Sequence, residues 1–124
     1  MYKIKNQVDS KLLADTIVSG MSDNKAEDIV LLDLREVENS VTDFFVICSG
    51  NSTTHVEGIV SSLTRETSRQ IKEKPWKQEG TKGSEWVLLD YINVVAHVFY
   101  KEAREFYDLE DLWADAKRTE IKDN

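Results

Sequence analysis

The chain has 124 residues and a formal net charge of −7, from 16 Lys and Arg against 23 Asp and Glu. This length fits a single domain over residues 1–124, and an apolar share of 40% supplies one hydrophobic core, which excludes a disordered chain. One Cys excludes an internal disulfide framework, and with only two His it leaves too few ligands for a usual zinc site.

The first half of the chain predicts a helix followed by a β-hairpin. Apolar residues recur every four positions in segment 9–21, which begins at a capping residue, either Asp9 or Ser10. Two short apolar runs follow at 28–34 and 43–48, with a polar break between them. Such runs are typical of strands, and the short break predicts that they pair as a hairpin.

A second helix is predicted after this hairpin. Ser52 is placed to cap it, and its apolar residues are spaced three and four positions apart. The helix is expected to run to about Lys74, where Pro75 ends it because proline pushes the preceding residue out of the helical region. A loop that holds Trp76 then leads to the last third of the chain.

The last third predicts a second hairpin and a final helix. Runs 86–91 and 94–100 have the composition of strands. A helix capped by Asp108 follows, and its apolar face consists of Leu109, Leu112, Trp113 and Ala116. The charged tail 115–124 is expected to fray. This order of elements predicts an α/β fold, a mixed β-sheet with helices packed on it.

Apolar patterning and charge limit the location and the partners. No apolar run approaches the ~18 residues that a membrane span needs, and residues 1–5 lack the apolar stretch of a secretory signal, so we expect a cytoplasmic protein without a membrane partner. Phosphate backbones repel a globally acidic surface, which disfavours nonspecific binding of DNA or RNA. Only segment 65–82 is basic, and its mixed charges are typical of a solvated helix face.

The turn 49–52 is the first candidate for chemistry, because backbone amides at a helix N-terminus after a strand can bind anions. It lacks the Lys-Ser/Thr ending of a P-loop and the three glycines of a dinucleotide fold, so the pattern favours a plain turn. His55 has no nucleophile beside it that a motif identifies, and Cys48 lies inside an apolar strand, where a thiol packs as a small hydrophobe.

Phosphoryl transfer needs carboxylates that converge on Mg²⁺, commonly two acids at alternate positions of a strand. Here Asp33 is followed at that spacing by Arg35, and Asp90 by Ile92. We therefore predict no catalytic residue, no metal site and no cofactor.

The aromatic residues favour a binding function, because they exceed what a small core readily hides and because protein interfaces are enriched in them. This set consists of Trp76, Trp86, Tyr91, Tyr100, Phe106 and Tyr107. His97 lies among apolar strand residues, with Val95 and Phe99 on its own face. Either a hydrogen-bonded core histidine or a contact on an exposed functional face fits this position.

Many of the same residues carry a resemblance to a known family. The matching segments are 42–52, 55–56, 79–80, 86–91, 94–95, 97–99, 104, 106–107, 109–110 and 112–113. In combination they resemble the Iojap family of ribosomal silencing factors over about residues 8–116, nearly the whole chain.

The resemblance implies a nucleotidyltransferase-like topology without the catalytic carboxylates, and no enzymatic activity. It implies a translational repressor that binds the large ribosomal subunit at ribosomal protein number fourteen and sterically blocks association with the small subunit. An acidic domain suits that partner, since ribosomal proteins are typically basic. The resemblance also implies a homodimer when the protein is free.

Carried over by position, the contact surface of the family is expected at Trp76, Leu88, Asp90, Tyr91, His97, Arg104, Phe106 and Tyr107. Trp76 and Tyr91 are the expected apolar anchors, and Asp90 is expected to meet a ribosomal Lys or Arg. The family commonly has Gly-Asp where this chain has Ile92 and Asn93, so we expect a turn without a positive φ here.

Two other functions stay open. A nucleotide-binding, transferase-like enzyme that uses the Ser49 to Ser52 turn would bind a nucleoside triphosphate with Mg²⁺ and lose it on alteration of Gly50 or Asp33. An RNA-binding module that uses segment 65–82 would weaken steeply with salt. Its binding would depend on Lys72, Lys74 and Lys77.

Overall fold

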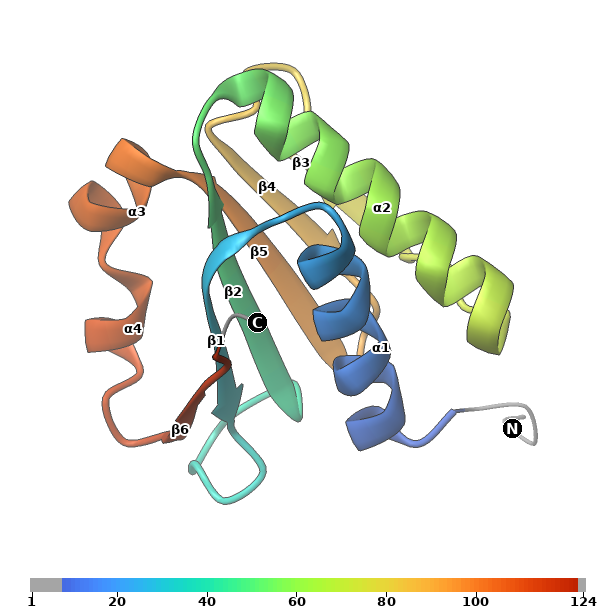
Figure 1. Cartoon of the computed structure of the whole chain (residues 1–124). Coiled ribbons are helices and arrows are strands. Elements are labelled where there is room, and N and C mark those ends of the chain that lie inside the picture. The colour runs from blue at the N-terminus through green and yellow to red at the C-terminus, as the bar shows by residue number, and fades with distance from the viewer. Residues whose placement is uncertain (1–7, 123–124) are drawn as a thin grey trace.

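The computed structural model describes residues 8–122 and consists of one six-stranded sheet with helices on both sides (Figure 1). Residues 1–7, where no secretory signal is expected, and 123–124, the end of the expected tail, lie outside the described residues. The helices are α1 (Ser10–Asp23), α2 (Thr53–Ile71), α3 (Lys101–Tyr107) and α4 (Leu109–Leu112). The strands are β1 (Glu27–Asp33), β2 (Phe44–Gly50), β3 (Lys77–Glu79), β4 (Trp86–Asp90), β5 (Val94–Tyr100) and β6 (Lys117–Glu120).

The strand order is β3-β4-β5-β2-β1-β6. Strands β1 and β2 pair antiparallel, as do β4 and β5, so both predicted hairpins are confirmed. The central pair, β2 with β5, is parallel, with Phe44 opposite Val94 and Gly50 opposite Tyr100. The predicted mixed α/β sheet is therefore confirmed, and α2 lies in the crossover between its parallel strands.

The two long helices begin where the capping residues predict. The Asp9 carboxylate accepts a hydrogen bond from the Leu12 amide at 3.1 Å, and the Ser52 hydroxyl accepts one from the His55 amide at 3.0 Å. Both helices cover the same face of the sheet (Figure 1). They cross closely at Gly20, where an added Cβ would lie 2.5 Å from the Leu63 Cα.

The two faces of the sheet have different cores because strand side chains alternate. The main core lies between the sheet and α1 and α2, and it includes Leu31, Val46, Leu89 and Val98. On the opposite face, α3, α4 and the segment after them cover only the half of the sheet near β1 and β2. The residues buried there are Val30, Leu32, Leu34, Ile47, Phe99 and Leu109. The half near β4 therefore stays open.

Helix α2 ends before the predicted position. Lys72 adopts a left-handed conformation with φ 60° and caps the helix, so the helix stops at Ile71 rather than at about Lys74. The Lys72 and Glu73 amides donate to the last-turn carbonyls of Ser68 and Thr67, which satisfies these groups without a further helical turn. The end is thus set by this cap, upstream of Pro75.

The C-terminal region also differs from the prediction. Asp108 is the N-cap of α4, as predicted, but with a φ of 49° it makes no side-chain capping bond, and it also ends α3, so the region forms two short helices. Leu112 is 76% exposed and does not share the buried face of Leu109. The expected frayed tail instead contains β6, which pairs antiparallel with β1.

The loop between α2 and the second hairpin contains a strand that its sequence does not indicate. All three residues of β3 are exposed, so the segment has no apolar alternation, and it is held only by antiparallel pairing with β4. Within the described residues, the structure has no helix long and apolar enough to cross a membrane.

In the turn between β4 and β5, the prediction of a negative φ is wrong. Ile92 has a φ of 76°, and the Asn93 amide donates to the Tyr91 carbonyl at 3.0 Å, which closes a γ-turn around Ile92. The Asp90 carboxylate supports the turn by accepting the Ile92 amide at 2.7 Å. A β-branched residue is strained in this conformation, which glycine adopts freely.

Replacement of Ile92 by Gly is expected to raise the free energy of unfolding by about 1 kcal/mol, because it removes backbone strain of that order at an exposed position. Chemical denaturation of the purified protein measures this change. Ile92→Ala is the matched control, since alanine keeps the Cβ and therefore the strain. A Gly variant no more stable than the Ala variant would contradict the assignment.

Candidate functional site

An open groove with a volume of about 470 Å³ lies on the uncovered half of the sheet. Its lining is mostly apolar, and it consists of Val41, Thr42, Phe45, Trp76, Leu88, Asp90, Ile92, Val95 and His97. Four of the residues predicted for the contact surface meet here: Trp76, Leu88, Asp90 and His97. We call this feature the docking groove.

The rim of the docking groove is built from loops that hydrogen bonds hold in place. Trp76 precedes β3, and its amide donates to the Asp90 carbonyl at 2.7 Å, which anchors the backbone while 72% of the residue stays exposed. Across the groove, the Thr42 hydroxyl donates to the Ile92 carbonyl at 3.0 Å. Both sides of the rim are therefore tied to the strand ends by hydrogen bonds.

The floor of the docking groove contains His97, which is only 3% exposed. The Trp86 indole donates to His97 Nδ1 at 3.1 Å, so a neutral ring carries its proton on Nε2. His97 Nε2 is the one buried side-chain nitrogen or oxygen in the described residues without a hydrogen-bond partner. Burial lowers the pKa of His97 to about 3, so the ring is neutral at physiological pH.

Phe106 and Tyr107 extend the apolar surface without lining the docking groove. Both belong to α3 and are exposed, by 82% and 50%. The Tyr107 ring lies 4.7 Å from the Trp86 ring between centroids, and Trp86 in turn contacts His97. These two predicted residues therefore lie beyond one end of the groove, separated from it by Trp86.

Tyr91 is not a surface anchor, and this part of the prediction is wrong. Its side chain is 6% exposed and points to the helix-covered face, where its hydroxyl lies 2.9 Å from the Thr67 hydroxyl. Burial raises the pKa of Tyr91 to about 12 against the lowering effect of the Thr67 hydrogen bond. The reason is strand alternation: Leu88 and Asp90 face the groove, so the residue after Asp90 faces the core.

Arg104 is also absent from the docking groove, because it ties α3 to the sheet. Its guanidinium donates to the Asp28 carbonyl at 2.7 Å and to the Ser49 hydroxyl at 2.8 Å, beside the irregular pairing at the start of β1. It also forms an ion pair with Glu110 at 2.6 Å. Only 11% of its side chain is exposed, so its donors are committed within the fold.

Five groove residues were not among the predicted site residues: Thr42, just before β2, and four apolar residues. Phe45 and Val95 follow from strand alternation, because they lie on the same face as His97. Val41 and Ile92 are 95% and 58% exposed and lie in connections between strands. The sequence signal that could have identified Val41 and Ile92 is an apolar residue within an otherwise polar connection.

The turn 49–52 has a structural role. The Asn51 amide donates to His55 Nδ1 at 2.9 Å, and His55 Nε2 lies 2.8 Å from the Asn24 carbonyl, so the ring joins this turn to the end of α1. An added Cβ at Gly50 would lie 3.0 Å from the Val56 side chain, so this glycine lets α2 approach the strand.

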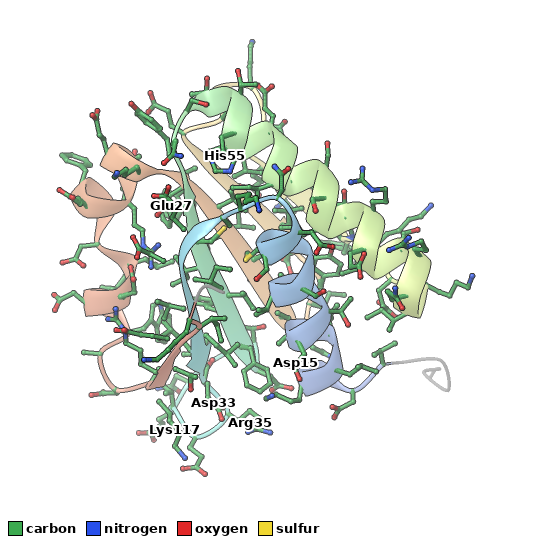
Figure 2. All side chains as sticks on the ribbon, viewed as in Figure 1. Asp15, Glu27, Asp33, Arg35, His55 and Lys117 are labelled. Atoms are coloured by element: carbon green, nitrogen blue, oxygen red, sulfur yellow. The ribbon has the colours of Figure 1, made fainter. Side chains whose placement is uncertain are left out.

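Asp33 lies at the other end of the sheet from this turn (Figure 2). It pairs with Phe44, six residues before Gly50 in an extended strand, which separates the two by roughly 20 Å. Arg35 binds Asp33 at 2.7 Å, and its hydrogen bonds lower the pKa of that carboxyl. Asp33 and Gly50 therefore do not form one nucleotide site.

Cys48 and the acidic residues form no reactive or metal-binding cluster in the described residues. Cys48 is fully buried, and burial raises the pKa of its thiol to about 12 despite the lowering effect of Arg104. Among residues 8–122, no group of three or more His, Cys, Asp or Glu side chains is arranged to hold a metal ion.

The fold defines a small α/β domain with an open, mostly apolar groove on one face of its sheet. A family model described as "Ribosomal silencing factor during starvation" (RsfS) matches residues 7–124. The chain therefore belongs to the family of ribosomal silencing factors, which are ribosome-associated regulators of translation. The family predicted from the sequence motifs is thus confirmed.

Individual relatives agree with this assignment. The chain is 38% identical over 110 residues to ribosomal silencing factor RsfS of Halalkalibacterium halodurans, covering 89% of this chain and 92% of that protein. It is 36% identical over 117 residues to RsfS of Bacillus subtilis, covering 92% and 95%. A crystal structure of a Chromobacterium violaceum protein superposes with a TM-score of 0.80 at 26% identity, covering 86% of this chain and 88% of that one.

The His97 imidazole is expected to show no titration between about pH 5 and 8, because its pKa lies near 3. The unfolded chain binds a proton on this ring below its ordinary pKa of 6.5, whereas the folded protein does not until about pH 3. The contribution of neutral His97 to stability is therefore complete above 6.5 and is lost as the pH falls toward 3. Imidazole chemical shifts measured by NMR test this, and a midpoint between pH 5 and 8 would refute it.

Arg104→Met is expected to lower the free energy of unfolding by about 3 kcal/mol, because it leaves the half-buried Glu110 carboxylate without its main cation. Lys101→Met, an exposed position on the same helix, is the control and should change stability by less than about 0.5 kcal/mol. Denaturation curves of both variants measure the difference. Equal stability of the two variants would show that Arg104 does not tie α3 to the sheet.

The ion pair also predicts a pH dependence. Burial raises the pKa of Glu110, but the hydrogen bond and charge of Arg104 and the charge of Arg118 outweigh this effect and hold it below the ordinary 4.5. The pair therefore contributes fully above about pH 4.5 and loses its contribution as the pH falls through the lowered pKa. The stability gap between wild type and Arg104→Met should narrow over that range.

Proposed function

We propose that this protein binds the large ribosomal subunit through ribosomal protein number fourteen, which occupies the docking groove, and that it sterically blocks association with the small subunit. The observation that carries the proposal is an ordered, open, apolar groove with a largely exposed Trp76 in a ribosomal silencing factor. Exposed apolar patches with aromatic residues are typical of protein-binding sites.

The chemistry of the docking groove suits a protein partner with one apolar side chain and one cation. Trp76 and Leu88 supply the apolar contact that dominates the energy of many interfaces. Asp90 accepts a hydrogen bond from the Ile92 amide through one oxygen, which leaves the other oxygen for a Lys or Arg of the partner.

The charge of the protein supports a basic partner. A net charge of −7 attracts a typically basic ribosomal protein and accelerates encounter, while the apolar groove limits dissociation. Repression in this proposal requires no chemical step, because a domain seated on the joining face of the large subunit excludes the small subunit. The proposed place of action is the cytoplasm.

The same surface supports a homodimer of the free protein. Burial of Trp76 and the exposed Phe106 against a second copy would remove apolar area from water. Such a dimer would compete with ribosome binding, because both would use the docking groove. Mass measurement in solution at high micromolar concentration tests this, and a protein that is entirely monomeric there would refute the dimer.

Trp76→Ala is expected to weaken binding to purified large subunits by at least about 30-fold, the effect of losing roughly 2 kcal/mol at the centre of an interface. Gradient sedimentation of wild type and variant with purified large and small subunits measures both binding and the fraction of joined ribosomes. The variant should neither sediment with large subunits nor reduce joining.

The matched variants Leu88→Ala and Leu112→Ala distinguish the loss of an apolar side chain in the docking groove from the loss of one elsewhere on the surface. Leu88 lines the groove, whereas Leu112 is exposed outside it. Only the first change should reduce binding, with circular dichroism showing that both variants are folded. Wild-type protein that fails to bind large subunits would overturn the proposed function, and equal binding by all variants would overturn the proposed interface.

A further inference from the structure

A second groove lies on the other side of the sheet edge, between α2 and the segment that leads into β3. Its volume is about 500 Å³, and it is lined by polar and basic side chains that include Ser61, Thr64, Arg65, Ser68, Lys74 and Gln78. Nitrogen-tipped side chains project from the C-terminal half of α2 into the solvent (Figure 2). We call this groove, together with the neighbouring Lys72, the basic face.

The cations of the basic face are uncommitted within the described residues. Arg65, Lys72 and Lys74 are exposed, and none of them forms an ion pair in the part of the chain that the structure describes. Of the acids nearby, Glu66 is paired with Arg69, and Glu73 offsets one of the three cations, so the basic face keeps a net positive charge. A positive surface therefore stands out on a protein whose net charge is −7.

Helix electrostatics do not account for this arrangement. Cations stabilise a helix C-terminus only within its last turn. Arg65 lies before the last turn of α2, and Lys74 lies beyond the end of the helix at Ile71. Hydroxyl groups and uncommitted cations along one groove are the donors that bind phosphate oxygens without regard to base sequence.

The basic face adjoins the docking groove across one edge strand. In β3, Gln78 pairs with Leu89 and faces the basic side, while Lys77 pairs with Asp90 on the docking side. Trp76 lines the docking groove, and Lys74, two residues before it, lines the basic face. A partner surface that meets this edge therefore contacts an apolar groove and a basic groove within a few residues of each other.

We propose that the basic face binds the phosphate backbone of ribosomal RNA beside the protein seated in the docking groove. This inference rests on the proposed function, because a ribosomal subunit presents protein and RNA side by side. The apolar groove then selects the site, and the phosphate contacts add affinity that depends on salt.

The test compares the salt dependence of binding to purified large subunits. The triple variant Arg65→Gln, Lys72→Gln, Lys74→Gln should bind more weakly at low salt. Its plot of log affinity against log salt concentration should be less steep than that of wild type by roughly 2, because each cation that neutralises a phosphate contributes about 0.7–0.9 to the slope. The control triple Lys25→Gln, Lys101→Gln, Lys122→Gln changes the net charge equally at exposed positions outside the basic face.

The outcomes separate the two proposals. A reduced slope for the basic-face variant alone, with Trp76→Ala losing affinity at every salt concentration, supports both. Wild-type binding with equal slopes for all variants overturns the RNA contact and leaves the proposed function standing. Equal changes of the salt slope in the basic-face variant and the control variant would show that net charge causes the effect, which would also overturn the RNA contact. Wild-type protein that does not bind large subunits overturns both.

Discussion

The parallel pairing of β2 with β5 is the constraint on which the rest of the structure depends. Its register places Phe45 opposite Val95 and Ile47 opposite His97, so it decides which side chains share each face. Parallel strands need a long crossover, which α2 supplies, and the close approach of α2 requires glycine at positions 20 and 50. The buried face of α2 and the open face of the docking groove therefore follow from one pairing.

The docking groove exists because the second face of the sheet is only half covered. Arg104 and Glu110 hold α3 and α4 against β1 and β2, where the apolar residues of that face need cover. No helix of the described residues covers the half near β4, so Leu88 and the edge of His97 stay at the bottom of a groove. Arg104, which does not line the groove, thus helps to hold the helices that cover the other half of this face.

Two kinds of surface chemistry meet at the short strand β3. The docking side offers apolar contact and a single carboxylate, which together favour a basic protein. The other side offers cations and hydroxyl groups, which favour phosphate. The unpartnered Nε2 of His97, within the described residues, and the strained γ-turn at Ile92 both lie on the docking side of the sheet.

The sequence by itself determined the helix starts at Asp9 and Ser52, both hairpins, the mixed α/β sheet and the family. These features depend on helix capping and on apolar periodicity, and both can be read within a short segment of the sequence. Only the tertiary structure decided that Tyr91 packs in the core, that Arg104 ties α3 to the sheet, and that β3 and β6 are strands. Each of these depends on a partner distant in sequence: Thr67 for Tyr91, Asp28 for Arg104, and a neighbouring strand for segments whose own residues are all exposed.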